Sequence, residues 1–84
     1  MVKAYIITCM TPGPYTKSLE EIKKINHIEK ISLVTGEYDI VVKVDVKNLE
    51  QLHLLTTQLQ KIHGVEKTTT HVIEKESITP SLQQ

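Results

Sequence analysis

The sequence lacks arginine entirely: its ten basic residues are all lysine, and ten acidic side chains bring the formal net charge to zero. Proteins that recognise nucleic acids depend on basic surfaces and on arginine forks that contact phosphates and guanine. The composition therefore argues against direct binding to DNA. The chain also shows no long apolar stretch typical of a membrane span and no secretory leader, which predicts a cytoplasmic location.

Cysteine and large aromatic residues are scarce, with one cysteine, three tyrosines, no tryptophan and no phenylalanine. Cys9 has no internal disulfide partner and lies in an alternating apolar segment typical of a strand. The four histidines lack the close spacing of metal ligands, so the sequence predicts no metal site and no cofactor. Catalytic triads, phosphate-binding loops and C-x-x-C motifs are also missing, which predicts a protein that is not an enzyme.

The chain does contain an internal repeat. The segment KINHIEKISLVTG at residues 24–36 resembles KIHGVEKTTTHVI at residues 61–73, at a spacing of 37 residues. The same spacing aligns Ile22 with Leu59 and Ile7 with Val44, so that each half repeats strand, helix and strand. The order βαββαβ predicts a ferredoxin-like α+β fold, in which a four-stranded antiparallel sheet carries both helices on one face.

Local patterns predict the elements. Segments rich in β-forming residues predict strands at residues 2–9, 28–35, 38–46 and 65–76. Apolar residues at helical spacing predict two helices, marked by Leu19, Ile22 and Ile25 in the first and by Leu49, Leu52, Leu55, Leu59 and Ile62 in the second. Asn48 and Gln51 form a capping-box pattern, and Gly64 supplies a stop. We expect a single domain over residues 1–76, followed by a polar tail at 77–84.

The repeat also predicts which side chains face the helices. Alternation places on that side Tyr38, Ile40, Val42 and Val44, and by alignment Tyr5, Ile7 and Cys9. The open face is then expected to hold Val2, Ala4, Ile6, Thr8, Val34 and Val41, ringed by Lys43, Thr68 and Thr70. An open apolar sheet face on a small domain is typical of an interface, so we expect self-association.

Two polar motifs are candidate ligand contacts. In TGEYD, residues 35–39, Gly36 and Asp39 suit a turn, but Asp39 is expected on the open face, where a carboxylate could hold an ammonium group. Backbone amides near Gly36 could hold a carboxylate. In TTT, residues 68–70, hydroxyls replace aliphatic residues of the first repeat; they suit a strand and could equally contact a small polar ligand. The residues alone leave both interpretations open.

Three segments resemble one known family: VTGEYDIVVKV, KIHGVEKTTT and the opening VKAYIIT with its following PG. Over residues 2–76 the chain resembles the effector-binding (RAM) domain of the Lrp/AsnC transcription regulators. The resemblance implies sheet-to-sheet dimers that join into rings, commonly octamers, with amino acids or related metabolites bound between dimers. It implies as ligand-binding residues Gly36, Tyr38, Asp39, Thr68, Thr69 and Thr70.

Typical family members carry an N-terminal helix-turn-helix domain, whereas this sequence starts at the effector module. We therefore expect a stand-alone, homo-oligomeric amino-acid sensor that works by itself or co-assembles with full-length regulators. Two alternatives stay open. One is a small dimeric ferredoxin-like enzyme of the cofactor-free monooxygenase or isomerase type, with His53 or His71 as base. The other is an assembly adaptor that senses nothing.

Overall fold

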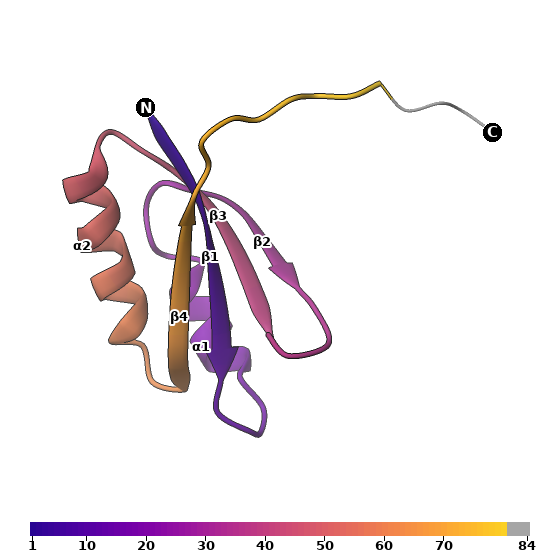
Figure 1. The fold of residues 1–84 in the computed structure, drawn as a ribbon. Helices are drawn as coiled ribbons and strands as arrows, with labels where there is room; N and C mark the ends of the chain where they lie inside the picture. The colour runs from indigo at the N-terminus through magenta and orange to yellow at the C-terminus, as the bar shows by residue number, and fades with distance from the viewer. Residues whose placement is uncertain (81–84) are drawn as a thin grey trace.

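A computed structural model of the chain, which describes residues 1–80, confirms the predicted βαββαβ order (Figure 1). The elements are β1 (Val2–Met10), α1 (Thr16–Ile22), β2 (Ile28–Leu33), β3 (Ile40–Val46), α2 (Leu49–Gln60) and β4 (Val65–Val72). All neighbouring strands are antiparallel, and their order in the sheet is β2-β3-β1-β4. This is the ferredoxin-like arrangement, with β1 and β3 in the centre.

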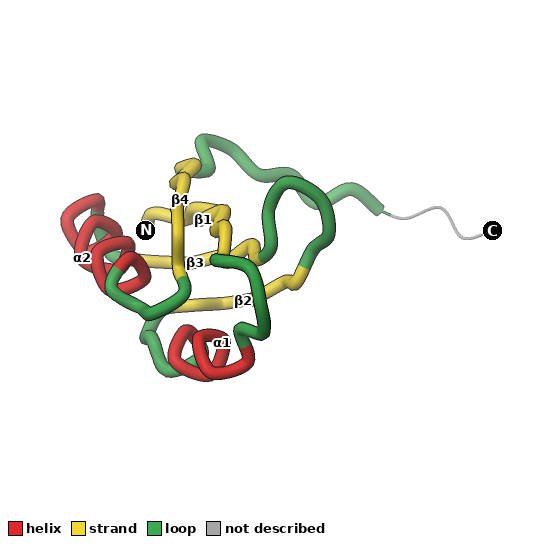
Figure 2. The backbone as a smooth tube through the Cα atoms, turned by 90° about the horizontal axis from the view of Figure 1, so that it is seen from below, coloured by secondary structure: helices red, strands yellow, loops and turns green. Residues whose placement is uncertain are grey.

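Both helices pack on the same side of the sheet, and the segment after β4 leaves on the side away from α1 (Figure 2). The sheet therefore has a helix-covered face and an open face. Among residues 1–80, neither helix combines the length and the apolar character needed to cross a membrane.

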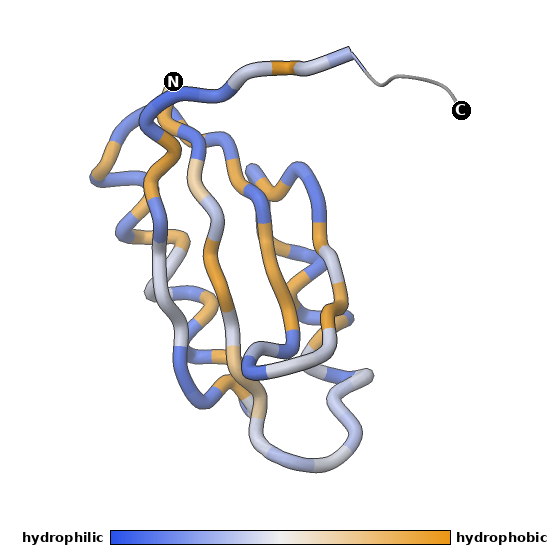
Figure 3. Tube along the Cα trace, turned by 45° about the vertical axis from the view of Figure 1, so that its right-hand side comes forward, coloured by the Kyte–Doolittle hydropathy of each residue, from blue (hydrophilic) through white to orange (hydrophobic). Residues whose placement is uncertain are grey.

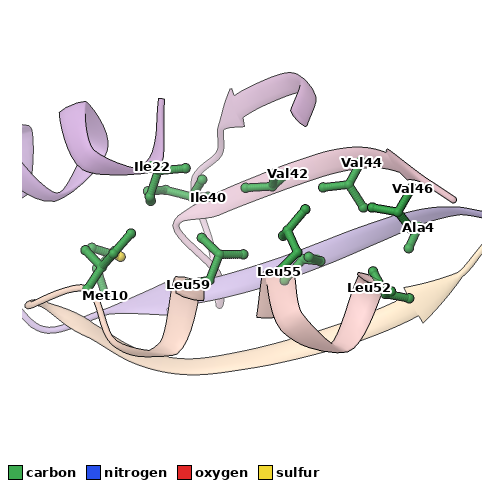
Figure 4. Close-up of a cluster of buried hydrophobic side chains, with 12 residues drawn as sticks. Ala4, Met10, Ile22, Ile40, Val42, Val44, Val46, Leu52, Leu55 and Leu59 are labelled. Atoms are coloured by element: carbon green, nitrogen blue, oxygen red, sulfur yellow. The ribbon is translucent and has the colours of Figure 1, made fainter. Parts of the chain in front are cut away.

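The hydrophobic core lies between the helices and the sheet (Figure 4). The fully or nearly fully buried apolar side chains are Ala4, Ile6, Met10, Ile22, Ile40, Val42, Val44, Val46, Leu52, Leu55, Leu59 and Ile62. Alternate residues of β3 supply one row of the core, as predicted. Three leucines of α2 cover this row at helical spacing, whereas Leu49, expected in the same stripe, is 62% exposed.

The predicted facing of β1 is wrong. Ala4, Ile6 and Thr8, expected on the open face, are fully buried on the helix side. Tyr5 is 37% exposed, and Ile7 and Cys9 are half-buried, because these three alternate with the buried row and lie on the open face.

The reason for this error is a difference in loop length between the two halves. Five residues, 11–15, join β1 to α1, but only residues 47–48 join β3 to α2. The spacing of 37 residues holds from the helices onward, where buried Ile22 matches buried Leu59. It fails for the first strand, and a register error of one residue turns every side chain of a strand to the opposite face.

The ends of the elements follow local chemistry. The Asn48 side chain accepts a hydrogen bond from the Gln51 backbone N–H at 2.8 Å, so the predicted cap of α2 is confirmed. The Gln51 side chain in turn accepts from the backbone N–H of Lys47 at 2.7 Å, one residue before the cap. Strand β3 begins at Ile40, two residues later than predicted, and Tyr38 is 40% exposed instead of facing the helices.

Gly64, in the turn between α2 and β4, has a φ of +98°, and a Cβ there would lie 2.8 Å from Ser18 Oγ. That hydroxyl is buried and donates to the His63 carbonyl. We expect Gly64→Ala to lower the free energy of unfolding by about 2–3 kcal/mol, through backbone strain and displacement of Ser18. Chemical denaturation measures the loss.

Gly13→Ala is the matched control for this prediction. Gly13 also has a positive φ, +113°, but no neighbouring atom lies within 4 Å of the added Cβ. The strain alone should cost about 1 kcal/mol there. Equal losses in the two variants would contradict a steric role for Ser18, and removing its hydroxyl in a Ser18→Ala/Gly64→Ala double variant should recover part of the loss.

Candidate functional site

The loop between β2 and β3 folds against the end of β1 and holds Asp39 in a fixed position. Inside the loop, the Val34 N–H donates to the Asp39 carbonyl at 2.9 Å, and Gly36 takes a φ of +123°. The Asp39 N–H donates to the Thr8 carbonyl at 3.1 Å. The Asp39 carboxylate then accepts from the Met10 backbone N–H at 2.7 Å. Contacts with β1 and within the loop thus fix the position of one acidic side chain.

This geometry explains why an acid precedes the apolar strand β3. Regular pairing of β1 with β3 stops at Thr8 and Ile40, while β1 continues to Met10. The half-buried Asp39 carboxylate supplies an acceptor for the Met10 amide at the position where the ladder has ended. A carboxylate has more acceptor positions than this one bond uses, so the side chain can bind a further donor.

The threonine run of β4 is divided between the two faces of the sheet. Thr68 and Thr70 pair with Thr8 and Ile6, whose side chains are buried on the helix side. The Thr68 hydroxyl accepts a hydrogen bond from the Gln60 side-chain amide of α2 at 3.0 Å. Thr69 pairs with Ile7 and so lies on the open face.

Within one chain, the loop residues and the threonine run flank opposite sides of β1. Asp39 bonds to β1 from the β3 side, whereas residues 68–70 pair with β1 from the β4 side. Gly36 and Tyr38 are exposed near Asp39 in the loop. The structure thus brings Gly36, Tyr38 and Asp39 together, and it places Thr69 on the open face across the width of β1.

Two residues absent from the predicted site lie between these groups. The Cys9 thiol of β1 donates to the Glu37 carbonyl of the loop at 3.6 Å. Lys67 of β4 pairs with Cys9 and therefore shares the open face with it and with Thr69. The alternation of side chains along β1 and β4 could have identified both residues. Cys9 was missed because the side chains of β1 were predicted on the wrong face, which placed Cys9 in the core.

The other end of the open face carries charge. Lys43 of β3 lies 5.7 Å from the centre of the Tyr5 ring, and Lys3 lies 4.0 Å from Asp45 and 3.8 Å from Glu29. The segment after β4, blue at its start in Figure 3, reaches across β1 to this cluster. There Glu76 accepts a hydrogen bond from the Lys43 ammonium at 2.8 Å.

This hydrogen bond has a measurable pH dependence. It is the main cause that raises the pKa of Lys43 above its usual 10.5 and lowers the pKa of Glu76 below its usual 4.5. Between pH 4.5 and pH 10.5 both side chains are charged, and the contact is present. It is lost at low pH as Glu76 protonates through its lowered pKa, and at high pH as Lys43 deprotonates through its raised pKa.

We expect Lys43→Gln to return the pKa of Glu76 toward 4.5, because the charged donor is removed. An NMR titration of the Glu76 carboxyl carbon in the two proteins measures the change. A titration midpoint of Glu76 that is the same in both would contradict the contact.

The space between helices and sheet is closed, which bears on the enzyme alternative. Ile6, Val42 and Leu59 are fully buried there, where a cofactor-free monooxygenase or isomerase would need a substrate cavity. The candidate bases lie elsewhere: His53 is on α2, where its carbonyl accepts from two threonines, and His71 is on β4 opposite Tyr5. In residues 1–80, no three His, Cys, Asp or Glu side chains gather as a metal site would require.

The fold and these contacts define a class, the small ferredoxin-like α+β domains with one open sheet face and a structured loop at its edge. The family model of the Lrp/AsnC ligand-binding domain matches residues 4–81 of the sequence, and the chain therefore belongs to this family. The resemblance seen in the sequence is thereby confirmed.

Individual relatives agree with this assignment. The transcriptional regulator FL11 of Pyrococcus furiosus is 32% identical over 74 residues, which are 88% of this chain and 49% of FL11. The chain spans about half the length of the curated relatives it matches first. The structure of TTHA0845 from Thermus thermophilus is similar with a TM-score of 0.82 at 25% identity, covering 94% of this chain and all of that one.

A more distant structure shares the fold. The feast or famine regulatory protein Rv3291c of M. tuberculosis, solved in complex with L-methionine, has a TM-score of 0.81 at 18% identity. The similarity covers 99% of this chain and 56% of that one.

Proposed function

We propose that this chain is a non-enzymatic sensing module that binds an amino acid or a related small metabolite and forms homo-oligomers. The observation that carries the proposal is the family match over residues 4–81, joined to a loop that fixes an acidic side chain beside an open sheet face. The methionine complex of a regulator with the same fold supports an amino acid as ligand.

The open face provides the surface for the first step of assembly. Its centre is apolar, with Ile7 and Val41 paired on adjacent strands, and its ends carry lysines and acids. A second copy placed sheet to sheet would remove this apolar centre from water. Dimers formed in this way would join into a ring, with eight chains as the expected number.

The loop provides the ligand contacts. An α-amino acid offers one ammonium and one carboxylate group, and the Asp39 carboxylate, which accepts from the Met10 amide, would bind the first. Backbone amides near Gly36 would bind the second, with Tyr38 beside the ligand. Of the three threonines predicted as contacts, Thr69 lies on the open face and would come from a neighbouring dimer, because β1 separates it from the loop within one chain. Thr68 and Thr70 lie on the helix side and are left out of the proposed site.

A ligand bound between dimers would bridge them and shift the assembly toward the state that binds it better. Because arginine is absent, we propose that any effect on transcription passes through full-length Lrp/AsnC regulators and not through direct DNA contact.

Thermal unfolding in the presence of each of the twenty amino acids tests the sensing function. A specific ligand at a hundred times its Kd is expected to raise Tm by several degrees, because it binds only the folded protein. Light scattering tests assembly in the same samples. An oligomer whose Tm responds to no amino acid at millimolar concentration would contradict sensing, and a monomer at micromolar concentration would contradict the assembly.

A further inference from the structure

A groove runs along the opposite side of the molecule, between α2 and the turn that follows α1. It consists of two adjoining hollows of about 510 and 420 Å³. Both are lined by Asn26, Gln58 and Lys61, so they form one continuous depression. We call it the helix-side groove. The open sheet face and the Asp39 loop take no part in it.

One residue of this groove has an unfavourable backbone conformation. His27 has a φ of 74°, and within residues 1–80 every other positive φ belongs to a glycine. The 37-residue repeat aligns His27 with Gly64, which has a φ of +98° in the equivalent turn. The turn therefore requires a left-handed residue in both halves, and the first half places a histidine where glycine would be unstrained.

The surroundings of the two positions differ. At Gly64 the buried Ser18 hydroxyl lies where a Cβ atom would be, so only glycine fits there without displacing it. At His27 the imidazole lines the groove and lies 3.4 Å from the side-chain amide nitrogen of Gln51. The Gln51 oxygen already accepts from Lys47, so its NH₂ group is the donor to His27 Nε2. The Nδ1–H of that tautomer is a further donor, and a strained, donor-bearing residue in a hollow suggests a binding role.

The groove is rich in donors and carries net positive charge. Its shared centre contributes two carboxamides, from Asn26 and Gln58, and the Lys61 ammonium. Lys24 lines one end, where Glu21 is the only acid among the lining residues described. Leu54, which is 61% exposed, offers apolar surface at the other end, where the nearly buried Leu55 also lines the hollow. Oxygen atoms of an anion match the centre, and an organic body matches the leucines.

We propose that the helix-side groove binds a small organic anion, whose carboxylate or phosphate group contacts Asn26, Gln58 and Lys61 and whose apolar part lies along Leu54 and Leu55. His27 positions this site: it contacts Gln51 and keeps the turn that carries Asn26 in place. The site is independent of the amino-acid site proposed above, because the two lie on opposite faces of the sheet.

NMR titration of the full chain tests the proposal, with hexanoate and hexyl phosphate as probes and sodium chloride at equal ionic strength as reference. Saturable shifts are expected at residues 24–27 and 51–61. Lys61→Gln should weaken binding about tenfold, the effect of one charge-assisted hydrogen bond. Lys23→Gln is the matched control, because Lys23 is an exposed lysine that pairs with Glu20 and does not line the groove. The probe that binds more tightly identifies the acidic group.

His27→Gly separates binding from folding. Relief of the left-handed strain should leave the fold intact and raise Tm by about 2–4 °C, while the affinity for the anion falls. An affinity for the anion that is unchanged in this variant would overturn the positioning role. Shifts that fail to saturate, or that weaken equally in Lys61→Gln and Lys23→Gln, would overturn the site. Either result leaves the response to amino acids unaffected, and so the two proposals fail separately.

Discussion

Replacement of Ile6 by alanine is expected to lower the free energy of unfolding by about 2–5 kcal/mol, the cost of a cavity in a packed core. Ile6 is fully buried in the central strand β1, between the sheet and the helices. Its neighbour Ile7 has the same side chain in the same strand but lies half-buried on the open face. Chemical denaturation of the two alanine variants compares the loss in free energy of unfolding on the helix-covered face with that on the open face.

The expected result for Ile7→Ala is a loss of about 1 kcal/mol or less in the monomer. Its larger effect should be on self-association, so that the unfolding midpoint no longer rises with protein concentration. Equal losses in the two variants at high dilution would contradict the assignment of faces. A concentration dependence that survives Ile7→Ala would instead remove the open face as the proposed interface.

Replacement of Asp39 by alanine is expected to cost about 1.5–3 kcal/mol of stability, because the buried end of β1 loses a charged acceptor at the Met10 amide. Asp39→Asn keeps a neutral acceptor of the same shape and should cost less. If Asp39 also binds the ammonium group of an amino acid, both variants should lose at least about tenfold in affinity. Calorimetry with the ligand found by thermal unfolding measures this loss.

Glu37→Gln is the matched control for Asp39, since it removes a nearby charge from an exposed residue whose contact with Cys9 is through its backbone carbonyl. It should leave both stability and affinity close to those of the parent. Full affinity in Asp39→Asn would limit Asp39 to its structural bond with Met10. An equal loss in Glu37→Gln would point to the general charge of the loop instead of a specific contact.

The fold was predictable because several signals agreed. The 37-residue spacing aligned Ile22 with Leu59, both fully buried, and Asn48 with Gln51 marked the start of α2. The repeat could not predict which side chains of β1 face the helices, because the alignment did not account for the different lengths of the loops after β1 and β3. Alternation within VKAYIITCM is compatible with either face, and only packing against the helices decides between them.

The candidate site was predictable in part. The pattern of Gly36 followed by Asp39 marked the loop correctly, but the bond from the Met10 amide joins residues far apart in sequence and leaves no local pattern. Thr68 and Thr70 were predicted at the rim of the open face. This placement is wrong, because they pair with Thr8 and Ile6, whose side chains are buried on the helix side, and only Thr69 lies on the open face. Cys9 and Lys67 lie side by side only because β1 pairs with β4, so they can be recognised as neighbours only once the register of that pairing is known.

The central position of β1 has a consequence for how the domain is made. This strand leaves the ribosome before the other three, yet its partners β3 and β4 are the third and the fourth strands in chain order. One edge of β1 therefore cannot pair fully until residue 46 has been synthesised, and the other edge cannot do so until residue 72 has been synthesised. Until then, the residues that later form the middle of the core are unpaired and exposed on the nascent chain. Synthesis thus has to pass the end of β4 before the sheet can close, a condition that favours late, cooperative folding over stepwise growth.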